Sequence, residues 1–396
     1  MQSFNSKPKI YLRSRTFMNI LFSAFINPER KSGVDKKIYG QIKAFKKLGH
    51  QVWYFTFRNN YIVLHHNDEE QALFTVQKNP IGYYLAIEKA VRQVATGKDR
   101  IKFDAIYIRR IFCTPFHLKT LKMLKEQGMV TVEEIPTYPY DNLNKNFKNP
   151  FYKAAARIDI WCRGGFKKYL DRFTTYTYDE VIFDVPALCL DNGIDFDNVN
   201  FIPTVFPEDR VDMIAVSAMA FWHGYERVIE GLAEYYAQSP EREVYFHLVG
   251  SGMEDAFYKE LTAKYNLEKY VIFHGHMISD DLADVFKQCQ IAFGSLGYYK
   301  ANMALSSPLK NREYMAMGKP YIFGHEENDP NVPKSVSLQI SNDATPVNIN
   351  TVLDFYDNVR KIPDVSAMMH QYAKEHYGWD VQLKKVADFM ENGLKK

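Results

Sequence analysis

The chain has 396 residues, of which 46% are hydrophobic and 24% charged, and its formal net charge is +3. This length exceeds that of one typical core and predicts two domains, while the composition excludes a disordered chain. The small net charge excludes nucleic acid as the main partner, because affinity for phosphate backbones needs lysine and arginine concentrated on one surface.

The first half of the chain alternates apolar runs of strand length with helical patterns. Apolar residues recur at helical spacing after Gly33, which predicts a helix at that point. The first apolar run is interrupted by polar residues and is far too short to cross a bilayer, so it is predicted to be a buried strand and its loop. Strands are predicted within residues 17–26, 51–57, 105–108 and 130–134.

A basic segment follows at residues 145–172, where eight lysines and arginines outnumber two aspartates. An apolar stripe that includes Phe151, Ile158 and Trp161 runs among these charges. Two interpretations remain open. The segment is either an amphipathic helix that lies on an anionic membrane, or a solvated helix whose stripe packs on the core, which we prefer slightly.

The second half repeats the alternation of strands and helices. Such alternation is typical of parallel sheets, so we predict an α/β fold with two sheets. Pro203 and Pro207 bracket the expected connection, which divides the chain into domains at residues 1–205 and 206–374. Strands are predicted at residues 213–217, 244–249, 271–273, 291–293 and 321–323.

The four cysteines are scattered and have no metal-ligand spacing. They are predicted to be reduced, buried thiols of a cytoplasmic protein, without a structural metal. No run approaches the length of a membrane-spanning helix. The cysteines are Cys113, Cys162, Cys189 and Cys289.

The most informative stretch is residues 303–323, in which a loop leads into a short helix and then a strand. Pro308 suits a first helical turn, and Gly318 ends the helix. Lys310 and Glu313 therefore share a helix face, and together they suit a ligand with both phosphates and hydroxyls. An ordinary surface ion pair is the alternative.

This stretch resembles the donor-site segment of retaining glycosyltransferases with the GT-B fold, especially bacterial family 4 enzymes that build capsules and exopolysaccharides. The shared features are Pro-Leu-Lys at 308–310, Glu-Tyr at 313–314 and Gly-Lys-Pro at 318–320. The resemblance implies two Rossmann-like domains that face a central cleft. It also implies that the helix at about 375–396 crosses back onto the first domain, although pattern alone equally allows a terminal core helix.

The resemblance assigns Glu313 to the nucleotide ribose and Lys310 to the diphosphate, with Ser307, Pro308 and Leu309 in the same donor loop. Many relatives carry a second glutamate where this chain has Leu305. Backbone groups of residues 306–307 or 294–297 would then have to hold the donor sugar.

Three further segments complete the implied donor site. Gly250, Ser251 and Gly252 follow a buried strand and could bind an anion through backbone N–H groups, or could simply form a tight turn. His223 and Gly224 would approach the diphosphate, with Arg227 a weaker candidate and Trp222 expected in the core.

Residues from His274 to Met277 would border the base. His274 and His276 alternate along a strand, so a shared metal is not expected.

The first domain is expected to supply the acceptor site and part of the reaction centre. Gly33, Val34 and Lys37 lie where a helix begins, in a segment that looks like the glycine loop of this fold. Arg109, Glu134, Tyr138 and Asp141 follow strand ends and could bind acceptor hydroxyls. Gly33 and Glu134 are predicted, with Lys310 and Glu313, to be catalytic. A buried structural ion pair between Arg109 and Glu134 is the open alternative.

The resemblance leads us to expect a retaining glycosyltransferase in bacterial surface polysaccharide synthesis, either cytoplasmic or peripheral at the inner face of the membrane. It would use a nucleotide-diphosphate sugar as co-substrate, a glycan or lipid-linked acceptor, and neither bound cofactor nor metal. The alternatives are another GT-B enzyme, such as an epimerase or phosphorylase, and a non-catalytic scaffold or regulatory partner of a glycosyltransferase complex.

Overall fold

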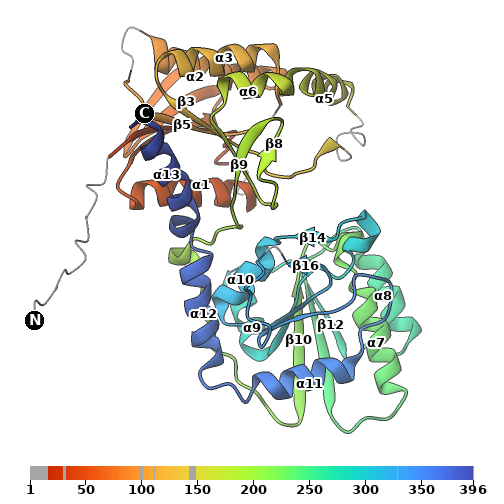
Figure 1. The fold of residues 1–396 in the computed structure, drawn as a ribbon. Helices are drawn as coiled ribbons and strands as arrows, with labels where there is room; N and C mark the ends of the chain where they lie inside the picture. Colours follow the sequence, from red (N-terminus) through yellow and green to blue (C-terminus); the bar gives the residue numbers. More distant parts are fainter. Residues whose placement is uncertain are drawn as a thin grey trace, which may run out of the picture.

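The computed structural model describes residues 17–29, 33–97, 101–110, 112–141, 149–277, 279–327 and 329–395. Two α/β units lie one above the other in Figure 1, joined by an extended segment and by the last two helices. One unit holds a nine-stranded sheet, and the other a six-stranded sheet with a separate two-stranded ladder. The α/β class and the two parallel-sheet units predicted from the sequence are confirmed.

The first sheet has the strand order β4-β3-β2-β1-β5-β6-β7-β9-β8. Its centre is parallel, while β3, β4 and β8 pair antiparallel at the two edges. The sequence interpretation missed the β3–β4 additions. The strands are β1 (Asn19–Ser23), β2 (Gln51–Arg58), β3 (Tyr61–His66), β4 (Glu69–Thr75), β5 (Ala105–Arg109), β6 (Val130–Glu134), β7 (Arg172–Thr175), β8 (Val181–Ile182) and β9 (Val185–Cys189).

Helices cover both faces of this sheet. One apolar core lies under α2 and α3, and a second lies under α1 and α13 on the opposite face. The helices are α1 (Gly33–Lys47), α2 (Pro80–Thr96), α3 (Pro115–Glu126), α5 (Pro150–Cys162) and α6 (Phe166–Tyr169).

The second sheet is parallel throughout and has the order β12-β11-β10-β13-β15-β17. Its strands are β10 (Arg210–Val216), β11 (Glu243–Val249), β12 (Val271–Gly275), β13 (Ile291–Phe293), β15 (Tyr321–Phe323) and β17 (Ser337–Gln339), with the ladder of β14 (Leu305–Ser306) and β16 (Glu326–Glu327) beside it. Its helices are α7 (Glu226–Tyr236), α8 (Asp255–Lys264), α9 (Ser279–Gln288), α10 (Leu309–Met317), α11 (Ile349–Val359) and α12 (Val365–His376).

The final helix, α13 (Trp379–Gly393), belongs to the core of the first unit although it follows the second in sequence. Trp379 lies between two glycines, because a methyl group on Gly40 or on Gly193 would come within 2.6 Å or 2.2 Å of its indole ring. The chain bends at Gly378, between α12 and α13. The predicted boundary at residues 205–206 falls in the extended segment between β9 and β10.

Candidate active site

Lys310 is the central cation of the donor side. It sits in the first turn of α10, a helix that lacks both a side-chain cap and an acidic residue in its first turn. Its Nζ donates a hydrogen bond to Tyr225 Oη at 3.2 Å, and burial lowers the pKa of its ammonium to about 7. Among the described residues, no carboxylate forms an ion pair with Lys310. The start of the helix and the ammonium therefore present positive charge that favours an anionic ligand.

Glu313 lies one turn further along α10 and its side chain reaches solvent. Loss of hydration among the surrounding protein atoms raises the pKa of its carboxyl, against the lowering effect of Lys36 and Lys310. Lys36 comes from α1 of the first unit, so Glu313 faces both units. Within the described residues, the carboxylate of Glu313 accepts no hydrogen bond from another side chain. Its oxygens can therefore accept hydrogen bonds from the hydroxyl groups of a ligand.

His223 lies beside Lys310 and is neutral. Its Nδ1 accepts a hydrogen bond from the Ala220 N–H at 2.9 Å, so the proton of the neutral ring is on Nε2. Burial and the Lys310 charge lower the pKa of His223 to about 3. Its Nε2–H is thus a neutral donor next to the Lys310 ammonium.

Gly224 allows two loops to meet under this pair. Its φ is +67°, and a methyl group on it would lie 2.6 Å from the backbone nitrogen of Gly297. The loop at residues 294–297 is held in turn by backbone hydrogen bonds to His223 and Trp222. The predicted donor residues 223–224 and 307–313 are therefore brought together.

Arg227 and Trp222 depart from the sequence interpretation. Arg227 donates to the carbonyls of Thr345 and Leu296 at 2.6 and 2.8 Å, so it fastens loops together and is not a free phosphate ligand. Trp222 is 40% exposed instead of filling the core. The three-residue helical turn at 221–223 turns its ring outward.

The predicted anion-binding segment at residues 250–252 packs tightly against the chain after β10. Methyl groups on Gly250 and Gly252 would lie 1.9 Å and 1.8 Å from the carbonyl oxygens of Ser217 and Ala218. The following helix α8 begins with Glu254 at its cap and Asp255 in its first turn, so its start is already negative. The close packing alone accounts for the two glycines, and the exposed Ser251 stays a donor-site prediction.

We expect Gly250→Ala to lower the free energy of unfolding by more than about 2 kcal/mol, because a side chain there meets both an unfavourable φ of +115° and the Ser217 carbonyl. Gly128→Ala is the matched control. Its φ is also positive, at +79°, but nothing lies within 4 Å of the added methyl group, so about 1 kcal/mol is expected. Urea denaturation compares the two, and equal losses would contradict the packing role of Gly250.

The predicted base pocket at residues 274–277 stays a prediction, and the structure shows what the side chains there contact. His274 Nε2 lies 2.9 Å from Nδ1 of His247, whose Nε2 contacts Asp212 at 2.9 Å. His274, His247 and Asp212 therefore form a row of hydrogen-bonded side chains within the sheet, and the His274 ring already has a hydrogen-bond partner. Met277 packs at the edge of the core. Within the described residues, no three His, Cys, Asp or Glu side chains gather as metal ligands would.

Glu134 is the centre of a hydrogen-bonded cluster of side chains in the first unit. It is fully buried and accepts hydrogen bonds from Arg109, Gln41, Tyr107 and Tyr176, the last three at 2.9, 3.1 and 2.8 Å. Burial would raise the pKa of this carboxyl, but the cations and donors around it lower the pKa to about 2. The ion pair that the sequence left as an alternative is thus present, and Glu134 holds other groups in place.

Lys37 is the group that Glu134 orients. Its Nζ lies 3.5 Å from Glu134 Oε1, donates to Asn192 Oδ1 at 2.9 Å and sits 3.7 Å from the centre of the Tyr176 ring. Burial lowers the pKa of Lys37 to about 8. Lys36 is exposed, so the two lysines are divided between solvent and protein.

A junction network, which the sequence analysis did not predict, joins Lys37 to the donor loop. Asn192 Nδ2 donates to the Ser307 carbonyl at 2.5 Å, and the Ser307 hydroxyl donates to Asp191. Arg312, fully buried in α10, donates to Asp191 at 3.0 and 2.8 Å and to Glu327 at 2.7 Å. The two units therefore meet through a charged network behind Ser307, Pro308 and Leu309.

The remaining predicted acceptor residues are dispersed. Val34 is exposed at the start of α1, beside Gly33, whereas Asp141 forms a two-point ion pair with Arg163 at 2.8 and 3.1 Å. Tyr138 packs its ring on those of Tyr140 and Phe183. Burial raises the pKa of Tyr138, and only part of its side chain reaches solvent.

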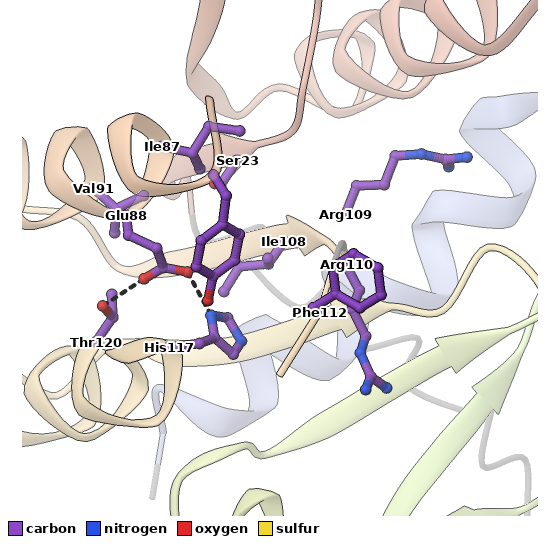
Figure 2. Close-up of a pocket in the computed structure, with 11 residues that line it drawn as sticks. Ser23, Ile87, Glu88, Val91, Ile108, Arg109, Arg110, Phe112, His117 and Thr120 are labelled. Atoms are coloured by element: carbon purple, nitrogen blue, oxygen red, sulfur yellow. Dashed lines mark hydrogen bonds and ion pairs between the residues drawn. The ribbon is translucent and has the colours of Figure 1, made fainter. Parts of the chain in front are cut away.

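The first unit also contains a narrow hollow, and Figure 2 shows its lining. His117 lies between Glu88 and Glu133, with N–O distances of 2.7 and 2.9 Å. These carboxylates overcome the effect of burial and raise the pKa of His117 to about 10. Arg109 points away from this buried group, toward Glu134.

The basic segment is described from residue 149 onward, and its predicted part at 145–148 lies outside the described residues. Residues 150–162 form α5, which buries Ala155, Asp159 and Cys162 and leaves Trp161 80% exposed. Within the described chain, no helix has the length and apolar character needed to cross a bilayer.

Comparisons of sequence and of fold relate the chain to a class of protein. Residues 198–332 match the family model of glycosyl transferases group 1, and the chain has the GT-B fold of solved glycosyltransferases. No curated protein matches the chain in sequence.

Three solved structures illustrate the likeness of fold. A glycosyltransferase from Rickettsia africae has 13% identity and a TM-score of 0.61, with 96% of this chain and 99% of that chain covered. Sucrose-phosphate synthase from Thermosynechococcus elongatus has 14% identity and a TM-score of 0.64, covering 95% and 99%. HepE of Anabaena in complex with UDP-glucose has 15% identity and a TM-score of 0.55, covering 95% and 100%.

Proposed function

We propose that this chain is a retaining glycosyltransferase that moves a sugar from a nucleotide-diphosphate sugar to a glycan or lipid-linked acceptor. One observation carries the proposal. Lys310 is a partly buried ammonium at an uncapped helix start, without a carboxylate partner among the described residues. Such a site favours an anion, and a diphosphate would supply one; HepE, which has the same fold, is solved in complex with UDP-glucose.

The residues divide the work between the two units. Lys310 and the His223 Nε2–H would neutralise the leaving diphosphate, and Glu313 would accept hydrogen bonds from ribose hydroxyls. On the first unit, Glu134 orients Lys37 and Arg109 toward the acceptor. Positioning and fixed charge would then supply most of the catalysis, with no bound cofactor or metal and with the leaving phosphate assisting acceptor deprotonation. We place this activity in the cytoplasm, in bacterial surface polysaccharide synthesis.

Ligand-induced thermal stabilisation tests the donor site. We expect either UDP-sugars or GDP-sugars, with the free nucleotide of that class, to raise the Tm of the protein, and Lys310→Ala and Glu313→Ala to weaken that shift, whereas CMP-sugars, which lack a diphosphate, should not shift it. Lys264→Ala, which removes an exposed lysine of α8 in the same unit, is the control and should keep the shift. Stabilisation that both site variants retain would place the ligand elsewhere.

Donor hydrolysis in the absence of acceptor separates the enzyme from a scaffold. A scaffold that kept the fold and the ligand site would show the thermal shift without turnover. The absence of any shift with every donor would overturn the proposed donor site.

A further inference from the structure

An apolar groove lies on the outer side of the first unit, between α2, α3 and α5. Its volume is about 570 Å³ and its walls are almost entirely apolar. Exposed side chains form its rim, with Ile81 and Leu85 on α2 and Ile158 on α5 between 41% and 48% exposed. Phe116 and Phe151 also line it. Apolar side chains gathered at this density on a surface mark a binding site, because scattered ones are the normal case.

Positive charge borders the same groove. Lys119 lines both the groove and an adjoining hollow of about 380 Å³, where Lys122, Lys168 and the exposed Trp161 meet. The described residues 149–172 carry six lysines and arginines against two aspartates. Apolar side chains with a basic border are complementary to an anionic lipid surface, and Trp161 has the amphipathic ring that favours the membrane interface.

The groove adjoins the narrow hollow of Figure 2. Tyr84 and Phe112 line both, and Arg109 is among the other residues that line the hollow. The side chain of Arg109 forms an ion pair with Glu134, which also lies near Lys37. A molecule with an apolar chain in the groove could therefore have its polar end on the side of Phe112 and Arg109.

We propose that this groove binds the hydrocarbon chain of an anionic lipid-linked acceptor presented by a bilayer. The head group would lie at the Phe112 side of the groove, outside the narrow hollow, which at about 20 Å³ is too small for a sugar. This inference rests on the proposed function and narrows its acceptor from a glycan or a lipid-linked molecule to the latter. It also gives the basic segment at residues 145–172 a role, through its described part α5, as one wall of a groove rather than as a helix lying flat on the membrane.

Vesicle sedimentation tests the proposal. We expect the protein to sediment with vesicles of phosphatidylcholine and phosphatidylglycerol more strongly than with phosphatidylcholine alone, and added salt to weaken this binding. Leu85→Glu and Ile158→Glu are expected to weaken it about tenfold, because each puts a charge where the chain would lie. Phe257→Glu is the control, since Phe257 on α8 is 43% exposed and lies on the other unit.

The outcomes separate the alternatives. Sedimentation that is absent in the wild type, or unchanged in both groove variants, would overturn the proposal. Self-association that both variants abolish, without vesicle binding, would assign the groove to a second copy and also overturn it. Donor-induced thermal stabilisation is read separately on the same proteins, so a failure of the proposed donor site is recognised independently of vesicle binding.

Discussion

Replacing Lys310 by methionine is expected to lower kcat/KM for the donor by about 100- to 1000-fold, the usual effect of removing a preorganised charge at a developing anion. We expect an effect of this size because no other cation in the described part of the chain shares the role of Lys310. Among the described residues, its ammonium donates a hydrogen bond only to the neutral hydroxyl of Tyr225. Steady-state kinetics of donor hydrolysis or transfer measure it. Lys264→Met, which removes an exposed charge from α8, should leave the rate within about twofold.

The pH profile gives this prediction a second readout. The pKa of Lys310 is lowered to about 7, so the free enzyme carries the ammonium below pH 7 and loses it above. We expect kcat/KM for the donor to fall about tenfold per pH unit above that value. Lys310→Arg should abolish this decline, because a guanidinium stays charged throughout the range. A decline that persists in the arginine variant would show that another group titrates.

The second large effect is expected from Arg312. Arg312→Met should lower the free energy of unfolding by about 3–5 kcal/mol, because it leaves the carboxylates of Asp191 and Glu327 buried without their cation. Urea denaturation measures the loss. Lys384→Met, which breaks an exposed pair with Asp388 on α13, is the control and should cost less than about 0.5 kcal/mol.

A compensated variant tests the mechanism of that loss. Combining Arg312→Met with Asp191→Asn and Glu327→Gln is expected to recover part of the stability, since buried neutral amides cost less than buried carboxylates that have lost their cation. No recovery would mean that Arg312 stabilises the junction network mainly by packing on the ring of Tyr377, 4.3 Å away.

The sequence predicted the sheets and much of the donor loop, because the information there is local. Hydrophobic periodicity marks each strand, and Pro308 and Gly318 mark the ends of α10, where the structure has them within a residue. The face shared by Lys310 and Glu313 follows from helix geometry alone. What these residues contact could not be predicted, since Tyr225 lies 85 positions from Lys310.

The junction network could not be predicted for the same reason. Asp191 and Arg312 are 121 positions apart, and neither belongs to a recognisable pattern. In the sequence, Arg312 resembles any exposed arginine on a helix surface, and only the fold shows that it is fully buried. The prediction for Trp222 was also wrong. Its large apolar side chain suggested a place in the core, but the short helical turn at 221–223 faces solvent and leaves Trp222 partly exposed.

The return of α13 to the first unit has a consequence for synthesis on the ribosome. The core that includes Phe22 and Phe45 of the first unit also needs Leu383, Val386 and Met390. These residues are translated after the whole second sheet, whose own core comes entirely from residues 194–377. The later-encoded unit can therefore complete its core first, and in the nascent first unit the face of the sheet that carries α1 stays partly uncovered until α13 is made.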